Sequence, residues 1–198
     1  MTRASGTEGY GETADVLAER YETLRFEDVH RETLHLIPAK PVTILDVGAG
    51  TGRDAAALVA RGHSVTAVEP TPELRAHGQR LHADANIVWI DDSLPHLARV
   101  AGTFDLVLLT AVWMHLDESQ RAHAMPAIAR LMKPGTLAIL SLRHGPVPKG
   151  RRMFDISAAE TSALAERHGL ATVHSSERPA MAHNSPDVWW SVLAFRRQ

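Results

Sequence analysis

The spacing of apolar residues predicts helices in the first forty residues and alternating strands and helices after them. From Thr13 to Phe26, apolar side chains recur at helical spacing, which predicts an amphipathic helix. A second, shorter helix is expected over residues 28–36. Beyond it, short runs rich in Val, Ile and Leu have the length and composition of buried strands. The expected strands cover residues 41–46, 64–69, 87–90, 104–110, 136–142, 171–175 and 188–196.

Cap and turn residues indicate where several helices begin and end. Thr71-Pro72 predicts a helix start, because proline is well tolerated at the first helical position. Ser157-Ala-Ala-Glu160 has the spacing of a capping box, and the helix that it opens is expected to end at Gly169. Pro134-Gly135 predicts a turn into the strand over residues 136–142. Two further helices are expected over residues 54–61 and 118–132.

This alternation of strands and helices predicts an α/β fold, a doubly wound and mostly parallel sheet with helices on both faces. The length of 198 residues suits a single domain over residues 1–198. Within it, residues 1–40 are expected to form a helical lid segment, 41–142 a ligand-binding core, and 143–198 a loop, a helix and a final strand pair. Ligands of such sheets bind beyond the carboxyl ends of the strands.

Composition removes several classes of function. Hydrophobic residues make up 44% and charged residues 22%, as in ordinary globular domains. The formal net charge of -2 lacks the electrostatic signature of a nucleic-acid-coating protein, and no nucleic-acid partner is expected. Because there is no cysteine, disulfides, thiolate zinc sites and a Cys nucleophile are excluded. No apolar stretch reaches the roughly 20 residues that cross a bilayer, and no signal core is present, so a cytoplasmic protein without a membrane partner is expected.

A glycine-rich loop follows the first expected strand. Gly48, Gly50 and Gly52 would let a ligand lie against main-chain N–H groups at the start of a helix, although such glycines can also serve only a turn. A dinucleotide fingerprint would have glycine where Arg53 stands. Asp46 would repel a pyrophosphate and suit a cationic ligand.

Acidic residues follow the next two strands. Glu69 lies 21 residues after Gly48 and is placed to hold both hydroxyls of a ribose. Asp91 and Asp92 come after the third strand, where a carboxylate could accept a hydrogen bond from an exocyclic amine. A ligand with an adenine amine, a ribose diol, an ammonium group and a sulfonium centre fits this set, as S-adenosylmethionine does.

At these residues the chain resembles class I S-adenosylmethionine-dependent methyltransferases. The resemblance is carried by Ile44-Leu-Asp-Val-Gly-Ala-Gly-Thr-Gly52, Glu69, Asp91-Asp92-Ser-Leu-Pro95, Phe104-Asp105-Leu-Val and Leu131-Met-Lys-Pro-Gly135. It spans residues 42–142 and implies a seven-stranded sheet whose last strand pair forms an antiparallel hairpin at one edge. One departure is Thr136, where the family usually has a second glycine.

The resemblance implies S-adenosyl-L-methionine as cofactor and S-adenosyl-L-homocysteine as product. The residues expected to bind it are Asp46, Gly48, Ala49, Gly50, Gly52, Glu69, Pro70, Asp91, Asp92, Ser93, Leu94, Thr110, Ala111 and Val112. The glycine loop would lie beneath the methionine moiety, and Asp46 would organise that loop. Glu69 would bind the ribose and either Asp91 or Asp92 the adenine amine, a choice that the spacing leaves open.

The methyl acceptor is less constrained by the sequence. The (Asp/Asn)-Pro-Pro-(Tyr/Trp) motif of enzymes that methylate exocyclic amines of bases is absent after the fourth strand. In its place, His115 could act as a general base or pack the loop, and Trp113 could wall the acceptor pocket or belong to the core. No His-x-His or His-Glu-x-x-His spacing occurs, so no metal site is expected.

Two further segments are expected to border the acceptor. The loop after the fifth strand carries Arg143 and Arg151, which could bind a carboxylate or phosphate or belong to a solvated basic loop. In the lid segment, Tyr10 and Tyr21 are expected to close over the cofactor and contact the acceptor. The absence of a long insertion between the strands favours a small acceptor.

The sequence therefore predicts an S-adenosylmethionine-dependent enzyme that methylates an oxygen or nitrogen atom of a small, anionic molecule. Two alternatives stay open. One is a module of the same fold that binds the cofactor or a partner without catalysis. The other is an NAD(P)-dependent oxidoreductase, which Asp46 and Arg53 disfavour. The oligomeric state is not predicted.

Overall fold

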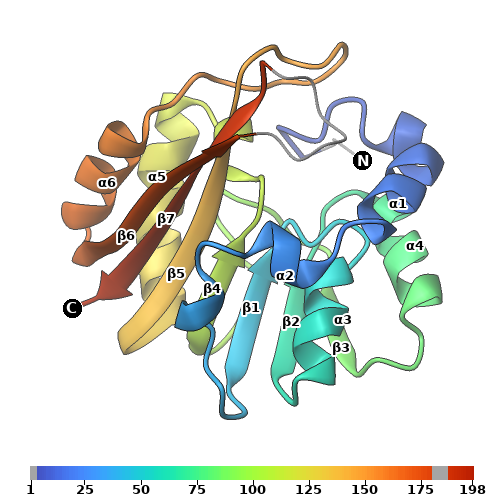
Figure 1. The fold of residues 1–198 in the computed structure, drawn as a ribbon, viewed down its shortest axis with the longest axis horizontal. Coiled ribbons are helices and arrows are strands. Elements are labelled where there is room, and N and C mark those ends of the chain that lie inside the picture. The colour runs from blue at the N-terminus through green and yellow to red at the C-terminus, as the bar shows by residue number, and fades with distance from the viewer. Residues whose placement is uncertain (1–3, 180–186) are drawn as a thin grey trace.

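The computed structural model describes residues 4–179 and 187–198, which fold around one mixed β-sheet (Figure 1). Its seven strands lie in the order β3-β2-β1-β4-β5-β7-β6. The five from β1 to β5 are parallel, and β7 runs antiparallel to both of its neighbours, β5 and β6. The strands are β1 (Thr43–Val47), β2 (Ser64–Val68), β3 (Ile87–Ile90), β4 (Phe104–Leu109), β5 (Met132–His144), β6 (Leu170–Pro179) and β7 (Trp189–Arg197). The predicted doubly wound α/β fold, with its antiparallel C-terminal strands, is confirmed.

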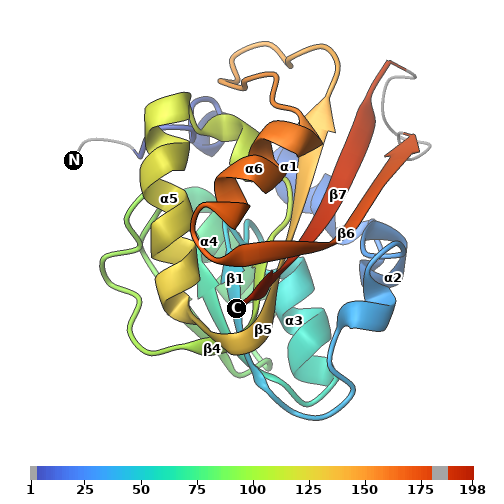
Figure 2. The same cartoon turned by 90° about the vertical axis from the view of Figure 1, so that its left-hand side faces the viewer.

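Helices cover both faces of this sheet. Figure 2 shows α2 and α3 on one side and α5 and α6 on the other, while α1 packs on α4. The helices are α1 (Ala14–Glu22), α2 (Phe26–Val29), α3 (Arg53–Ala60), α4 (Pro72–Leu81), α5 (Glu118–Leu131) and α6 (Ala158–Glu166). Among the described residues, no helix combines the length and the apolar character that a membrane crossing requires.

Alternation along the central strands builds two separate cores. Ile44 and Leu106 belong to the cluster under α3, whereas Leu45 and Val107 belong to the cluster under α5 and α6. All four side chains are fully buried, because a parallel strand in the middle of such a sheet is covered on both faces. Because β1 to β5 run parallel, the carboxyl ends of these strands lie at a common edge of the sheet.

The predicted caps are largely confirmed. Ser157 accepts a hydrogen bond from the Glu160 N–H, and the Glu160 carboxylate accepts one from the Ser157 N–H, which is the predicted capping box. Thr71 is the N-cap residue of α4, with Pro72 at its first position, but the Thr71 side chain makes no capping bond.

Two predicted boundaries are wrong. The expected helix over residues 28–36 is replaced by α2, which starts at Phe26, and a separate 3₁₀ turn over Leu34–Leu36. The strand expected to start at residue 136 starts at Met132 instead. Its pairing with β4 is interrupted between Met132 and Leu137, where Gly135 adopts a φ of 80°. The predicted turn at Pro134-Gly135 is therefore a bulge inside β5, which lets the strand bend without ending.

Candidate active site

The glycine loop lies between the carboxyl end of β1 and the start of α3. The N–H groups of Gly48 and Ala49 donate to the Val68 carbonyl at 2.7 and 2.9 Å, so the loop is tied to the neighbouring strand. Gly48 has a φ of +69°, and a Cβ there would lie 2.5 Å from a methyl group of Val112. A side chain at this position would therefore meet both backbone strain and a clash.

Glu69 lies beneath this loop at the end of β2 and is buried. Its Oε2 accepts a hydrogen bond from the Gly50 N–H at 2.8 Å, and its Oε1 accepts one from the Thr71 N–H at 2.7 Å. Burial raises the pKa of Glu69, although these two N–H groups oppose the rise. A carboxylate acceptor is thereby held rigidly at the floor of the site.

Two further buried acids, Asp54 and Asp46, lie close to the same loop. Asp54 binds His30 Nε2 at 2.8 Å, Arg53 Nη2 at 2.7 Å and the Thr110 hydroxyl at 3.1 Å. Burial alone would raise the pKa of Asp54, but His30 and Arg53 outweigh it and hold that pKa below its ordinary value. Asp46 is also buried, and its Oδ2 has no hydrogen-bond partner among the described residues. Burial, and then the charge of Asp54, raise the pKa of Asp46 well above its ordinary value.

The two acids after β3 differ in position. Asp92 lines the cavity together with Ser93 and Leu94, and its carboxylate accepts hydrogen bonds from the N–H groups of Ser93 and Arg99. The Asp91 side chain is 56% exposed and pairs with Arg75 at 3.2 Å. Asp92 is thus the one of the two that faces the cavity.

These residues surround one cavity of about 370 Å³ at the carboxyl edge of the sheet. The loops after β1, β2, β3 and β4 form its floor, and the N-terminal segment with α1 covers it. The sequence-predicted residues that line it are Tyr10, Tyr21, Asp46, Gly48, Ala49, Gly50, Glu69, Pro70, Asp92, Ser93, Leu94, Thr110, Ala111, Val112, His115, Arg143 and Arg151. Gly52 instead packs against Trp89, at the outer end of the same loop.

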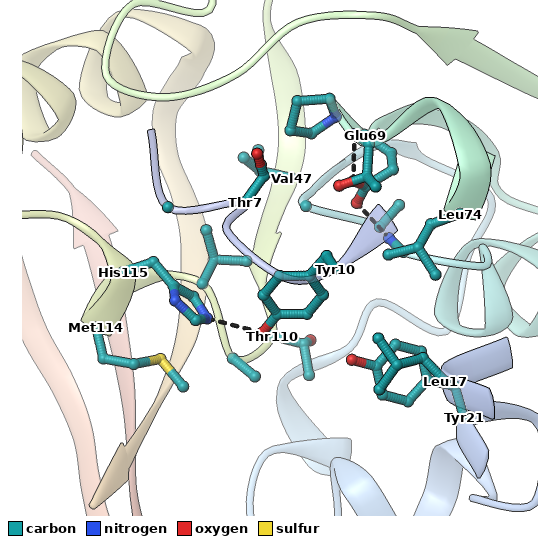
Figure 3. Close-up of a pocket in the computed structure, with 18 of the residues that line it drawn as sticks. Thr7, Tyr10, Leu17, Tyr21, Val47, Glu69, Leu74, Thr110, Met114 and His115 are labelled. Atoms are coloured by element: carbon teal, nitrogen blue, oxygen red, sulfur yellow. Dashed lines mark hydrogen bonds between the residues drawn. The ribbon is translucent and has the colours of Figure 1, made fainter. Parts of the chain in front are cut away.

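A tyrosine and a histidine meet inside this cavity. Tyr10 Oη and His115 Nε2 are 3.0 Å apart, and Figure 3 shows Tyr10 between His115 and Tyr21. His115 Nδ1 lies 2.7 Å from the Arg152 carbonyl, which can only accept, so Nδ1 carries the proton and Nε2 accepts from the Tyr10 hydroxyl. Burial lowers the pKa of His115 and, more strongly, raises that of Tyr10, which keeps both groups neutral.

The two arginines expected in the loop after the fifth strand have different positions, because β5 runs on to His144 and includes Arg143, while Arg151 lies in the loop. The Arg151 guanidinium stacks 3.7 Å from the Tyr10 ring centre and donates to the Glu8 carbonyl and the Thr13 hydroxyl. Arg151 therefore holds the N-terminal segment over the cavity. Arg143 donates to the Pro146 carbonyl at 2.8 Å and is half-buried in the cavity wall.

The structure corrects the acceptor-pocket interpretation of Trp113. This side chain has no exposed surface and packs in the core on the α5 and α6 face of the sheet. The reason is local: Trp113 opens a short 3₁₀ turn over Trp113–His115, which directs His115 into the cavity and Trp113 into the core.

Several cavity residues were missed by the sequence interpretation. Asp54 lines the cavity and pairs with His30, which lies behind it and 24 positions away in the chain, and neither belongs to a recognisable motif. Arg178 and Trp190 line the cavity from β6 and β7. Because Arg178 and Trp190 lie far from the glycine loop in sequence, no local pattern indicated that they line the same cavity. Among the described residues, no group of three or more His, Asp or Glu side chains could hold a metal ion.

Comparison with known proteins agrees with this geometry. A family model described as a methyltransferase domain matches residues 44–135. An uncharacterized methyltransferase of Mycobacterium tuberculosis is 36% identical over 107 residues, which cover 50% of this chain and 39% of that protein. Glycine N-methyltransferase of Oryctolagus cuniculus is 26% identical over 187 residues, covering 77% of this chain and 62% of the relative. The chain thus spans between 39% and 62% of the length of these relatives.

Solved structures share the fold at low sequence identity. A TehB-like SAM-dependent methyltransferase from Corynebacterium glutamicum superposes with a TM-score of 0.70 at 20% identity, covering 94% of this chain and 99% of that one. The N-methyltransferase NodS from Bradyrhizobium japonicum, in complex with S-adenosyl-L-homocysteine, gives a TM-score of 0.68 at 17% identity, covering 91% and 87% of the two chains.

Proposed function

The chain carries a methyltransferase domain of the class I S-adenosylmethionine-dependent family, and from this premise we propose that it transfers a methyl group from S-adenosyl-L-methionine to an oxygen or nitrogen atom of a small, anionic molecule. The observation that carries the proposal is the shared cavity. It joins the glycine loop and the rigid Glu69 carboxylate to the Tyr10–His115 pair.

The residues present fit this cofactor. The unpartnered Asp46 Oδ2 is a buried acceptor at the cavity wall and suits the ammonium group of the methionine moiety. Each carboxylate oxygen of Glu69 and Asp92 accepts one hydrogen bond from a backbone N–H group. Further lone pairs are left for the ribose hydroxyls and the adenine amine. When bound, the cofactor supplies a sulfonium-activated methyl group and its own leaving group.

Tyr10 and His115 are suited to handling the proton of the acceptor. Methylation of an amine or hydroxyl leaves one proton to be removed from the acceptor atom. The Tyr10 oxygen can accept that proton while the Tyr10 hydroxyl proton moves to the lone pair on His115 Nε2, which the buried, neutral imidazole keeps available. Tyr10 would be the catalytic residue that touches the acceptor, and His115 the base behind it.

Arg143 supports an anionic acceptor. It lines the cavity, and burial lowers the pKa of its guanidinium, which reflects a cation that has lost part of its hydration. A carboxylate or phosphate of the substrate would restore favourable interactions in bidentate geometry. We place the protein in the cytoplasm, with a small molecule rather than a nucleic acid as its substrate.

A thermal shift with S-adenosyl-L-methionine, S-adenosyl-L-homocysteine and NADH tests the cofactor. At 100 times its Kd, a ligand adds about 2.7 kcal/mol, which for a domain of this size is a rise of roughly 5–11 °C. Both sulfur nucleosides should raise the melting temperature and NADH should not. A rise with NADH alone would overturn the proposal in favour of an oxidoreductase.

Turnover is tested separately, by release of S-adenosyl-L-homocysteine with a panel of amines and alcohols that carry a carboxylate or phosphate. Release that depends on one of these acceptors is expected. Cofactor binding without release from any of them would favour a non-catalytic binding module.

A further inference from the structure

Three cavity side chains lie in a single row across the C-terminal part of the sheet. Arg143 on β5 is the direct partner of Trp190 on β7, and Trp190 is the direct partner of Arg178 on β6. Direct partners on neighbouring strands project from the same face, and strands are about 4.8 Å apart. The two arginines therefore flank the indole, and all three side chains line the same cavity.

The next row of the same strands shows that this placement is specific. His144 and Trp189 are also direct partners, but they stack on each other at 3.7 Å and line a smaller cavity, which Arg143 borders as well, whereas Trp190 and Arg178 line only the larger one of these two. On β7, alternation thus directs Trp190 to the larger cavity and Trp189 away from it.

The row presents hydrogen-bond donors that lack acceptors. Within residues 4–179 and 187–198, the Trp190 Nε1 and Arg178 Nε atoms are buried and have no hydrogen-bond partner. Arg178 is only 6% exposed, and the hydrogen bond that it makes within these residues is a long one, 3.5 Å from Nη2 to the Val29 carbonyl. Buried donors normally find acceptors, so this deficit calls for an explanation.

Charge in the row is also incompletely balanced. Among the described residues, the one carboxylate within 4 Å of Arg178 is that of Glu32, at 3.6 Å, and Arg31 shares the same carboxylate at 3.0 Å. Burial lowers the pKa of the Arg178 guanidinium, Glu32 raises it and Arg31 lowers it. On the other side of the indole, Arg143 faces Tyr10 and Arg20.

We propose that the Arg143–Trp190–Arg178 row binds the anionic group of the methyl acceptor, a carboxylate or phosphate, with Arg178 and the Trp190 N–H as specificity-determining donors beside Arg143. This inference rests on the proposed function, and it adds β6 and β7 to the acceptor site. One planar anion between two guanidinium groups and an indole N–H would satisfy the unpaired donors and offset the excess positive charge. The C-terminal hairpin then selects the substrate while the parallel strands hold the cofactor.

The binding test follows the indole N–H signal of Trp190 in ¹H–¹⁵N spectra of the full chain saturated with S-adenosyl-L-homocysteine. Trp190→Phe assigns this signal among the four tryptophans. Acetate and inorganic phosphate are titrated in separate arms, with chloride at equal ionic strength as reference. We expect saturable movement with at least one of the two anions, and the stronger arm distinguishes a carboxylate from a phosphate acceptor.

Variants then separate recognition from folding. Arg178→Met should lower the affinity for the anion at least tenfold, and Arg178→Lys should lower it less. Glu32→Gln should raise the affinity for the anion severalfold, because the competing carboxylate is gone and Arg178 keeps its charge. Arg196→Met is the matched control, since Arg196 is exposed on the same strand as Trp190 and should leave the affinity unchanged.

Three results would overturn the inference. They are movement that chloride reproduces, equal affinity in Arg178→Met and the unchanged protein, and weaker binding in Glu32→Gln. If Arg178→Met does not fold, Glu32→Gln still decides the matter, since a purely structural ion pair predicts no gain in affinity. Titrating S-adenosyl-L-homocysteine into separate, ligand-free samples of the same proteins keeps the two proposals apart, because absence of that binding contradicts the cofactor assignment and not the anion row.

Discussion

At the scale of single residues, the cavity is organised by which atoms already have partners. The Arg152 carbonyl fixes the tautomer of His115, and the tautomer in turn fixes the direction of the Tyr10 hydroxyl. A main-chain carbonyl thus determines where a proton can go in the site. Backbone partners of this kind are set by the fold, so the residue types alone would not reveal the relay.

Tyr10→Phe tests the relay, because it removes the hydroxyl and keeps the ring under Arg151. We expect kcat to fall by about 10²-fold or more, the range of general acid–base contributions. The Kd of S-adenosyl-L-homocysteine should change little. A variant with unchanged kcat, measured with the acceptor in excess, would limit Tyr10 to a packing role.

The pH profile tests His115. The imidazole must be neutral to accept a proton, so activity should be complete at high pH and be lost as pH falls through the pKa of His115. Burial lowers that pKa from its ordinary value of 6.5, so the acidic limb of kcat should lie below pH 6.5. His115→Gln should abolish this limb, and a limb at or above 6.5 in the unchanged protein would contradict the assignment.

At the scale of elements, the end of β5 and the loop that follows it contact two different parts of the site. Arg151 reaches the N-terminal segment through the Tyr10 ring, Glu8 and Thr13, while Arg143 stays in the cavity wall. The end of β5 and the basic loop after it therefore join the cover of the site to the proposed acceptor side. The sequence predicted both arginines as acceptor contacts, because a run of cations does not show which side chain will bind another segment of the chain.

Paired alanine variants separate these two roles. Arg143→Ala should raise the KM of the acceptor and leave cofactor affinity unchanged. Arg151→Ala should weaken S-adenosyl-L-homocysteine severalfold and speed amide hydrogen exchange in α1, because the cover loses a cation–π contact of roughly 0.5–1 kcal/mol and two hydrogen bonds. Equal acceptor KM values in Arg143→Ala and the unchanged protein would remove Arg143 from the acceptor site.

What the sequence predicts at this scale follows from the range of the physical signal. Hydrophobic alternation and glycine spacing are local, so β1 to β4, the loop and Glu69 were all predictable from patterns of a few residues. The Arg143–Trp190–Arg178 row depends on the register of three strands, two of which are paired across more than forty positions of sequence. No local pattern encodes that register. The direction of the Trp113 side chain likewise depends on tertiary packing, which no local pattern encodes.

At the scale of the whole molecule, the site is built at a cost to stability. Asp46, Asp54 and Glu69 are all buried around one loop, and of these three acids it is Asp54 that pairs with His30 and Arg53. Burial raises the pKa values of Asp46 and Glu69, so the folded state binds their protons more tightly than the unfolded state does. For a group of this kind, stability is complete below the unfolded pKa and is lost as pH rises through the folded pKa.

Asp46→Asn should therefore stabilise the cofactor-free protein and impair its function. At low pH the unchanged protein carries a protonated Asp46, so the two proteins should melt at similar temperatures. As pH rises, only the unchanged protein has to bury a second carboxylate beside Asp54, so its melting temperature should fall below that of Asp46→Asn. Each tenfold change in the acid's ionisation constant on folding corresponds to about 1.4 kcal/mol, or roughly 3–6 °C for a domain of this size.

The same variant should respond less to the cofactor, because the amide cannot neutralise an ammonium group. S-adenosyl-L-homocysteine should bind the unchanged protein more tightly as pH rises, since the bound cation favours ionised Asp46, whereas Asp46→Asn should bind weakly and without this pH dependence. Melting curves from pH 5 to 8, with and without the ligand, measure both effects in one series. Asp54→Asn serves as the contrast and should lower stability throughout, because it removes the carboxylate that pairs with the half-buried Arg53 guanidinium and with buried His30. If Asp46→Asn instead melts lower at pH 8 and keeps the full ligand-induced rise, Asp46 is a structural acid, and the ammonium group must find its acceptor elsewhere in the cavity.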